Sequence, residues 1–289
     1  MGEGFFMHNR IPLEKLLDQA GNLPPMPRAA QRAMEIIRDP NYDMAQLAQV
    51  IKLDQAMSGL ILRWVNSGYF SLRNQITSIE QAVAYLGQRA VQDMLLSASV
   101  AEYMNKPVPG YALERGDLWK HSVGMAAGAR LIVKDIEPKW MEEAYYCGLF
   151  ADVGKLAFDL MLRNLNFDPN MLGNYTFDTV ETSLFGYDHP TVGAAMVRRW
   201  KLSEAVACAI QNHHTPANSP ADCRVLAYAV HAADAVMNMF GVGIGRDGLH
   251  YQLDQQTPAV LHWNEKSLER MYDMVIPMVQ EAERFLERK

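Results

Sequence analysis

The stretch Ala151-Asp152-Val153-Gly154-Lys155 decides the fold of this 289-residue chain, because it lies at the centre of a long helical pattern. Apolar residues on both sides recur at helical spacing, and they predict a helix over residues 140–162. Lys155 follows Asp152 by three positions, which puts both side chains on one helix face. The sequence therefore predicts a carboxylate beside an ammonium group within an apolar helical region.

Helical patterns continue outward from this stretch in both directions. Toward the C-terminus they predict helices at residues 113–132, 176–185, 190–200, 203–213, 223–239 and 265–288. Toward the N-terminus they predict helices at residues 28–38, 43–51, 55–65, 78–87 and 89–103, with Asp43 and Ser78 as N-caps. Sustained alternation with a period of two, the mark of β-strands, occurs nowhere, so the predicted fold class is all-α.

The proline- and glycine-containing stretch KPVPG, residues 106–110, is the clearest interruption of these patterns. It predicts a two-lobed helical bundle, with an N-terminal lobe at residues 15–105 and a second lobe at residues 110–240. Residues 241–289 would form a loop and an amphipathic C-terminal helix. The glycines of residues 241–248 follow no strand and lack phosphate-loop spacing, so they indicate a turn.

Composition narrows the classes of function. Hydrophobic residues make up 49% of the chain, which is enough for a sizeable core. The net charge of -6 disfavours general nucleic-acid binding. No apolar run approaches membrane-spanning length, and residues 1–10 do not resemble a signal peptide, so we expect no membrane association and a cytoplasmic location. The three cysteines form no CxxC motif; we expect Cys147 and Cys208 to be small core residues, in a reducing compartment.

Histidines and aspartates from five predicted helices supply the only candidate chemical centre. The candidate metal ligands are His121, Asp152, His189, His213, His214 and Asp234. Imidazoles and carboxylates bind divalent transition metals, and helical bundles build such sites from facing helices. Lys155 would hold a phosphate oxygen as a point charge, a catalytic role only if the protein is an enzyme.

Structural roles compete with ligation for several of these residues. His213 and His214 close a predicted helix, where the negative end of the helix dipole favours an imidazolium. Asp234 would pair with His231, three residues before it on the same helix. Asp152 would be only a helix-start carboxylate, and His189 only a capping residue before Pro190.

The order of these residues resembles the HD superfamily of metal-dependent phosphohydrolases, whose pattern is His, then His-Asp, then Asp. His121, Asp152 and Asp234 match this order, and Val153-Gly154-Lys155 match the residues that follow the family's doublet. His189 and His213 or His214 match the additional histidines of two-metal members. Ala151 stands where the family has the first residue of the doublet, and alanine offers no donor atom.

Further matches make the chain similar to the HDOD family, the HD-related output domain of bacterial signalling proteins. They include Leu23-Pro-Pro-Met-Pro27, Leu62-Arg-Trp-Val-Asn-Ser67, Phe185-Gly-Tyr-Asp-His189 and His213-His214, spread over about residues 15 to 240. The resemblance implies an all-helical fold with an HD-like second lobe, a role in signalling and frequent loss of catalytic metal ligands.

Three functions follow as expectations. The first is a non-enzymatic signalling output or scaffold domain that acts through a signalling protein partner. Its degenerate metal site would bind a divalent ion (Fe, Mn, Mg or Zn) weakly or not at all, because Ala151 replaces a ligand histidine. The second is a divergent metal-dependent phosphohydrolase acting on a nucleotide or phosphodiester. The third is a sensor that binds a nucleotide or metal without turnover.

Overall fold

The structure is a computed structural model that describes residues 12–19, 32, 35–36, 39, 43–66, 75–246, 248 and 250–287. Within these ranges every extended regular element is a helix, and the sole β-type pairing is an isolated antiparallel bridge between Val108 and Leu113. The all-α prediction is therefore confirmed. Contacts divide the described residues into two compact units, one within Met1–Leu23 and Met104–Val279, the other within Pro24–Tyr103 and Gln280–Lys289.

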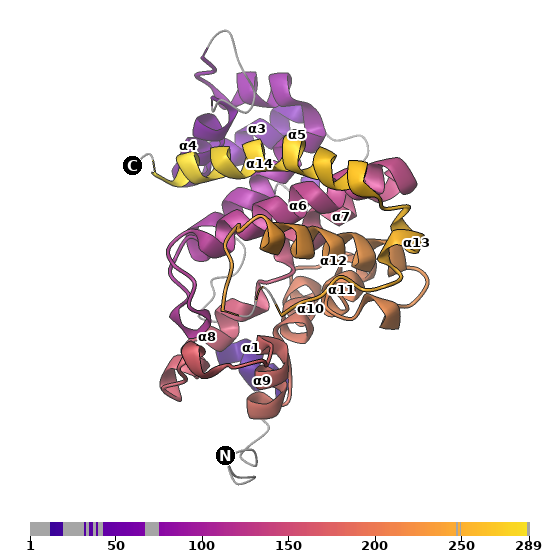
Figure 1. Cartoon of the computed structure of the whole chain (residues 1–289). Helices are drawn as coiled ribbons and strands as arrows, with labels where there is room; N and C mark the ends of the chain where they lie inside the picture. Colours follow the sequence, from indigo (N-terminus) through magenta and orange to yellow (C-terminus); the bar gives the residue numbers. More distant parts are fainter. Residues whose placement is uncertain are drawn as a thin grey trace. The chain divides into compact units, whose positions relative to one another are not determined.

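The first unit contains most of the helices (Figure 1). They are α1 (Leu13–Gln19), α6 (Asp117–Ile136), α7 (Met141–Phe150), α8 (Gly154–Asn164), α9 (Phe177–Phe185), α10 (His189–Arg199), α11 (Glu204–Gln211), α12 (Arg224–Met239), α13 (Thr257–Leu261) and α14 (Glu265–Glu287) up to Val279. Short 3-10 turns η3 (Pro109–Tyr111), η4 (Pro138–Trp140), η5 (Pro169–Met171) and η6 (Pro216–Asn218) connect some of them.

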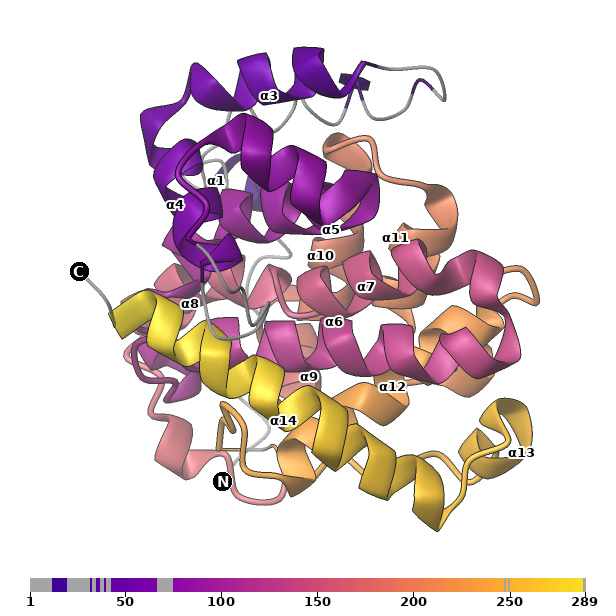
Figure 2. The same ribbon diagram turned by 90° about the horizontal axis from the view of Figure 1, so that it is seen from above.

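Packing of α6 against α7 and α12 forms the centre of this unit, and Figure 2 shows α6 and α7 side by side. A Cβ atom added at Gly148 of α7 would lie 2.5 Å from the backbone of Met125 in α6. Glycine therefore permits an approach that any larger residue would prevent. This close packing fixes the end of α7, and with it the position of Asp152 just beyond.

The second unit contains α3 (Met44–Lys52), α4 (Gln55–Val65), α5 (Ile79–Met104) and the end of α14. Asp43 caps α3 as predicted, because its carboxylate accepts a hydrogen bond from the backbone N–H of Ala45. Gly87 interrupts α5 with a φ of 72°, so the two helices predicted on either side of it are confirmed. The proline motif at residues 23–27 lies outside the described residues, as does most of the helix predicted at 28–38.

The single helix predicted over residues 140–162 is wrong. The chain instead forms α7 and α8, separated by a turn at residues 151–153. In this turn the N–H of Val153 bonds to the carbonyl of Phe150, and that of Lys155 to the carbonyl of Asp152, both with three-residue spacing. The backbone stays in the right-handed helical region, with Ala151 at φ -50° and ψ -46°. Ala151 and Val153 both have right-handed helical backbone angles, so no left-handed residue or proline marks the break. The apolar pattern of the sequence therefore continues across it.

Candidate metal centre

Asp152 lies in the turn between α7 and α8, and its side chain is buried. Asp152 and Lys155 lie next to each other as predicted, since Lys155 Nζ is 3.0 Å from Asp152 Oδ1. The N-cap position of α8 belongs to Val153, so the Asp152 carboxylate is not a simple helix cap. It points instead toward histidines of other elements.

Four donor side chains converge in the first unit: Asp152, His189, His213 and His214. One ligand atom of each lies within 4.8 Å of those of the other three. His189 Nε2 is central, at 3.4 Å from Asp152 Oδ1 and 3.1 Å from His214 Nε2. We call these four side chains the His/Asp cluster. They come from three segments: the turn before α8, the start of α10 and the segment after α11.

The outward nitrogens of two of these imidazoles have their own partners. His189 Nδ1 lies 2.9 Å from Glu181 Oε2, and His213 Nδ1 lies 2.7 Å from the carbonyl oxygen of Ile210. His213 Nε2 is buried and has no hydrogen-bond partner among the residues that the structure describes. Metal-binding histidines characteristically donate one ring N–H to a carboxylate or carbonyl and ligate through the other nitrogen. His189 and His213 have this arrangement.

His121 and Asp234 lie beside the His/Asp cluster as a pair. His121 Nε2 lies 3.0 Å from Asp234 Oδ1 and 3.8 Å from Asp152 Oδ2, while its Nδ1 lies 2.8 Å from the Val242 carbonyl. Asn238 donates a second hydrogen bond to Asp234 Oδ1 at 2.9 Å. The chain thus brings all six candidate ligands into one region but joins only four of them in the convergent set.

Burial and neighbouring charges set the protonation of the His/Asp cluster before an ion binds. Burial, followed by the charges on neighbouring histidines, lowers the pKa of His213 and lowers that of His214 further. Burial opposes ionisation of Asp152, yet Lys155 and His189 hold its pKa well below the usual range. Burial also opposes the charge on His189, but Glu181 and Asp152 outweigh it and raise its pKa to about 10. Neutral imidazoles and a carboxylate are the forms that ligate metals, and an incoming ion would displace the proton of His189.

Two further structural alternatives do not hold in the structure. His231 does not pair with Asp234; its Nδ1 lies 2.8 Å from the His213 carbonyl and its Nε2 accepts from the backbone N–H of Asp254. His189 is not the cap of α10, because Asp188 accepts from the N–H of Thr191 at 2.9 Å. His213 does contact the end of α11 through the Ile210 carbonyl, but its pKa is lowered by burial, so the imidazolium expected at a helix end is not favoured.

Sequence reasoning missed Glu181, whose side chain has no exposed surface. It accepts hydrogen bonds from the backbone N–H of His189 and the hydroxyl of Tyr111, each at 2.5 Å, and contacts the His189 ring. A signal was present, because Phe177, Glu181 and Phe185 follow one another at four-residue spacing on one helix face. An acidic residue between two aromatic residues on a buried face needs a specific partner.

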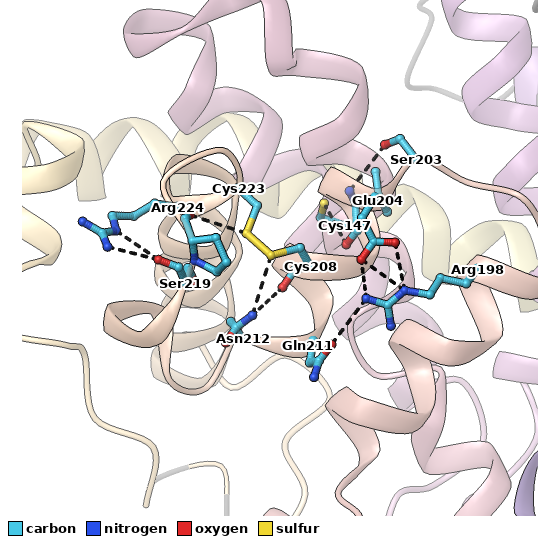
Figure 3. The surroundings of a disulfide bond; sticks show 12 residues. Cys147, Arg198, Ser203, Glu204, Cys208, Gln211, Asn212, Ser219, Cys223 and Arg224 are labelled. Atoms are coloured by element: carbon cyan, nitrogen blue, oxygen red, sulfur yellow. Dashed lines mark hydrogen bonds and ion pairs between the residues drawn. A yellow bond between two sulfur atoms is a disulfide. The ribbon is translucent and has the colours of Figure 1, made fainter.

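The expectation that Cys208 is a small core residue is wrong. Cys208 and Cys223 form a disulfide with a Cα–Cα distance of 6.2 Å (Figure 3). Spacing along the sequence does not reveal such a pair, because the loop between them sets their distance. Cys147 is the expected buried free thiol. Across the described parts of the chain, no helix combines the length and apolar character that a bilayer crossing requires.

The family follows from a comparison of the whole sequence with known families. Residues 23–216 match the HDOD domain. The chain belongs to the HDOD domain family. A curated relative, an uncharacterized protein of Treponema pallidum (strain Nichols), is 23% identical to this HDOD chain over 227 residues. That match covers 76% of this chain but 43% of the relative, so the chain spans less than half of the relative's length.

Solved structures share the fold. An HDOD domain protein of unknown function from Geobacter sulfurreducens has a TM-score of 0.71 at 23% identity, covering 93% of this chain and 97% of the other. A protein provisionally assigned to signal transduction, from Marinobacter aquaeolei VT8, also has a TM-score of 0.71, at 20% identity. The match covers 97% of this chain and 61% of the other. A provisionally assigned metal-dependent phosphohydrolase from Shewanella amazonensis SB2B has a TM-score of 0.62 at 20% identity. The match covers 93% of this chain and 96% of the other.

Proposed function

We propose that this HDOD chain is a non-enzymatic signal-transduction output domain, and that its His/Asp cluster binds one divalent transition metal ion as a structural or sensing element. The observation that carries the proposal is the convergence of four protein donors: Asp152, His189, His213 and His214. Closed structural zinc sites take four protein ligands, whereas catalytic sites take three and keep a position for water or substrate.

Two of the distances between the donors support this assignment. Ligand atoms at 2.0–2.1 Å from a tetrahedral ion lie about 3.3 Å from one another. The His189–His214 and His189–Asp152 separations are 3.1 Å and 3.4 Å. Three imidazoles and one carboxylate favour Zn²⁺ or Fe²⁺ over Mg²⁺, which prefers an all-oxygen shell.

Ala151 and the burial of the donors argue against turnover. Ala151 removes a ligand that the hydrolase pattern contains, and Lys155 is already paired with Asp152. A substrate phosphate would need an open coordination position, but all four donor side chains are at most 7% exposed. In the proposed role the chain passes its signal to a protein partner, and the ion fixes the elements that carry its ligands.

Metal analysis of the purified chain tests the binding site. We expect close to one equivalent of Zn²⁺ or Fe²⁺, strongly reduced by His213→Ala and unchanged by His250→Ala, since His250 is an exposed histidine of the same unit. A wild-type chain that retains no ion after incubation with Zn²⁺, Fe²⁺ or Mn²⁺ would overturn the metal assignment.

An activity panel tests the non-enzymatic assignment. The chain loaded with Zn²⁺, Fe²⁺, Mn²⁺ or Mg²⁺ is incubated with nucleotides, cyclic dinucleotides and a generic phosphodiester, and no turnover is expected. Turnover that disappears in Asp152→Ala would establish a hydrolase instead. Heat on titration with a nucleotide, without turnover, would indicate a ligand sensor, and a pull-down that recovers no specific protein would count against the partner role.

A further inference from the structure

The Cys208–Cys223 disulfide lies at the base of the segment that carries two of the candidate ligands. Cys208 is in α11, and Cys223 is the residue before α12, 15 positions later in the sequence. The chain between them contains His213 and His214. The disulfide therefore closes a loop, which we call the His213–His214 loop, and joins the helices on either side of it (Figure 3).

Weaker contacts hold the same loop. Asn212 Nδ2 donates to the carbonyl of Cys208 at 2.8 Å, and Arg224 donates to the carbonyl of Ser219 at 3.1 Å. The backbone carbonyl of His213 contacts His231 Nδ1 at 2.8 Å, which ties the loop to α12. These contacts do not need the disulfide, so we expect the loop to keep its general path when the sulfur–sulfur bond is broken.

The two sulfurs are suited to reversible chemistry. Cys208 is half-buried, whereas Cys223 is 1% exposed, so Cys208 is the more accessible of the two residues. After reduction the Cys223 thiol has an acceptor available, because its sulfur lies 3.7 Å from the Pro220 carbonyl.

Cys147 does not compete with this pair. It is fully buried in α7, with its sulfur 3.8 Å from the carbonyl oxygen of Val206. Burial, together with the nearby charge of Glu143, raises the pKa of the Cys147 thiol well above its usual value. A buried, protonated thiol is unreactive toward disulfides. Cys147 is therefore a matched control for the reactive pair.

We infer that Cys208 and Cys223 form a reversible redox modification site, and that their disulfide increases the metal affinity of the His/Asp cluster by restricting the His213–His214 loop. The inference rests on the proposed metal site. Cross-linking the two ends of a loop removes conformations of its metal-free state, so less ordering remains to be done when the ion binds. Reduction would restore those conformations and weaken binding without changing any ligand.

The oxidation proceeds by thiol–disulfide exchange with a low-molecular-weight disulfide. The Cys208 thiolate attacks one sulfur of the reagent, which breaks the reagent's S–S bond, forms a mixed disulfide and releases one thiol. The Cys223 thiolate then attacks the Cys208 sulfur and releases the second thiol. Two cysteine thiols are oxidised and the reagent is reduced to two thiols. A dithiol or phosphine reductant reverses the change.

Zinc titration of the full chain in both redox states tests the inference. One sample is treated with oxidised glutathione and the other with a phosphine reductant, which brings no competing thiol. We expect the oxidised sample to bind Zn²⁺ on the order of tenfold more tightly, because the cross-link has already removed part of the ordering cost of the loop. The Cys147→Ala chain should respond in the same way, and the Cys208→Ser/Cys223→Ser chain should show the reduced affinity in both conditions.

Peptide mass spectrometry and hydrogen exchange add readouts that need no metal. The oxidised chain should yield a Cys208–Cys223 cross-linked peptide, and residues 212–222 should exchange faster after reduction. Equal zinc affinities in the two states, or the lack of the cross-linked peptide, would overturn the inference while leaving the metal site intact. Failure of both states to bind zinc would instead overturn the proposed function and this inference with it.

Discussion

Glu181 has the most closely defined role among the residues around the His/Asp cluster. Its two carboxylate oxygens accept from the Tyr111 hydroxyl and from two groups of His189, the backbone N–H and the ring. These contacts fix the orientation of the His189 imidazole. Carboxylate partners of this kind raise the basicity of a ligand histidine and hold its second nitrogen toward the metal.

Glu181→Gln should weaken metal binding by roughly 10- to 100-fold. The new amide group presents donors where His189 also donates, so one buried donor loses its acceptor. This should cost about 1 to 3 kcal/mol in the free energy of unfolding. Zinc titration and urea unfolding measure the two effects. Glu204→Gln is the control, because Glu204 pairs with Arg198 at the surface and such pairs contribute little.

His189 gives the metal-free protein a characteristic pH dependence. Its pKa rises from 6.5 to about 10 on folding, so between these values the folded chain holds a proton that the unfolded chain releases. The stabilisation is complete below pH 6.5 and is lost as the pH rises through about 10. The urea midpoint of the metal-free chain should therefore fall from pH 7 to pH 9. His189→Gln should flatten this fall, and equal slopes in the two chains would contradict the assignment.

Much of the candidate centre was predictable from residue type and order. The sequence predicts all six candidate ligands, and the structure places them in one region. They are His121, Asp152, His189, His213, His214 and Asp234. Their division into a convergent set and a flanking pair was not predictable, because it depends on side-chain directions set by packing between helices. Glu181 was identifiable in principle from its position between Phe177 and Phe185 on one helix face.

Helix boundaries were predictable where caps or glycine conformations marked them. The Asp43 cap and the break at Gly87 are examples. The break after Phe150 was not predictable, because its residues keep right-handed backbone angles and only the hydrogen-bond spacing changes. Tertiary packing, not local preference, decides such a break.

Gly154 shows what packing requires at this break. A Cβ atom at Gly154 would lie 2.1 Å from the carbonyl oxygen of His189, so α8 and α10 meet backbone to backbone. Gly154→Ala should separate them, lower the free energy of unfolding by about 1 to 3 kcal/mol and weaken zinc binding, because Asp152 and His189 move apart. Gly59→Ala, in α4 where no atom of the described residues lies within 4 Å of the added Cβ, should instead stabilise the chain by up to about 1 kcal/mol. Thermal unfolding compares the two, and equal effects would contradict this packing argument.

Metal binding should stabilise the molecule to an extent set by its affinity. Zinc at about 100 times its dissociation constant adds about 2.7 kcal/mol to the free energy of unfolding, and a rise in Tm of roughly 4 to 5 °C follows for a chain of this length. Differential scanning calorimetry with Zn²⁺ or with a chelator measures the change. His213→Ala should show the same Tm in both conditions, and a similar rise in that variant would place the stabilising ion elsewhere.

The ligands of the His/Asp cluster come from separate segments, the turn before α8, the start of α10 and the loop after α11. None of these segments has more than two donors, so the complete binding site forms only when the helices have docked. An ion would then bind after the rate-limiting step of folding and leave the refolding rate nearly unchanged. Its effect would fall on the unfolding rate, so the metal-loaded protein would persist longer under denaturing stress without folding any faster.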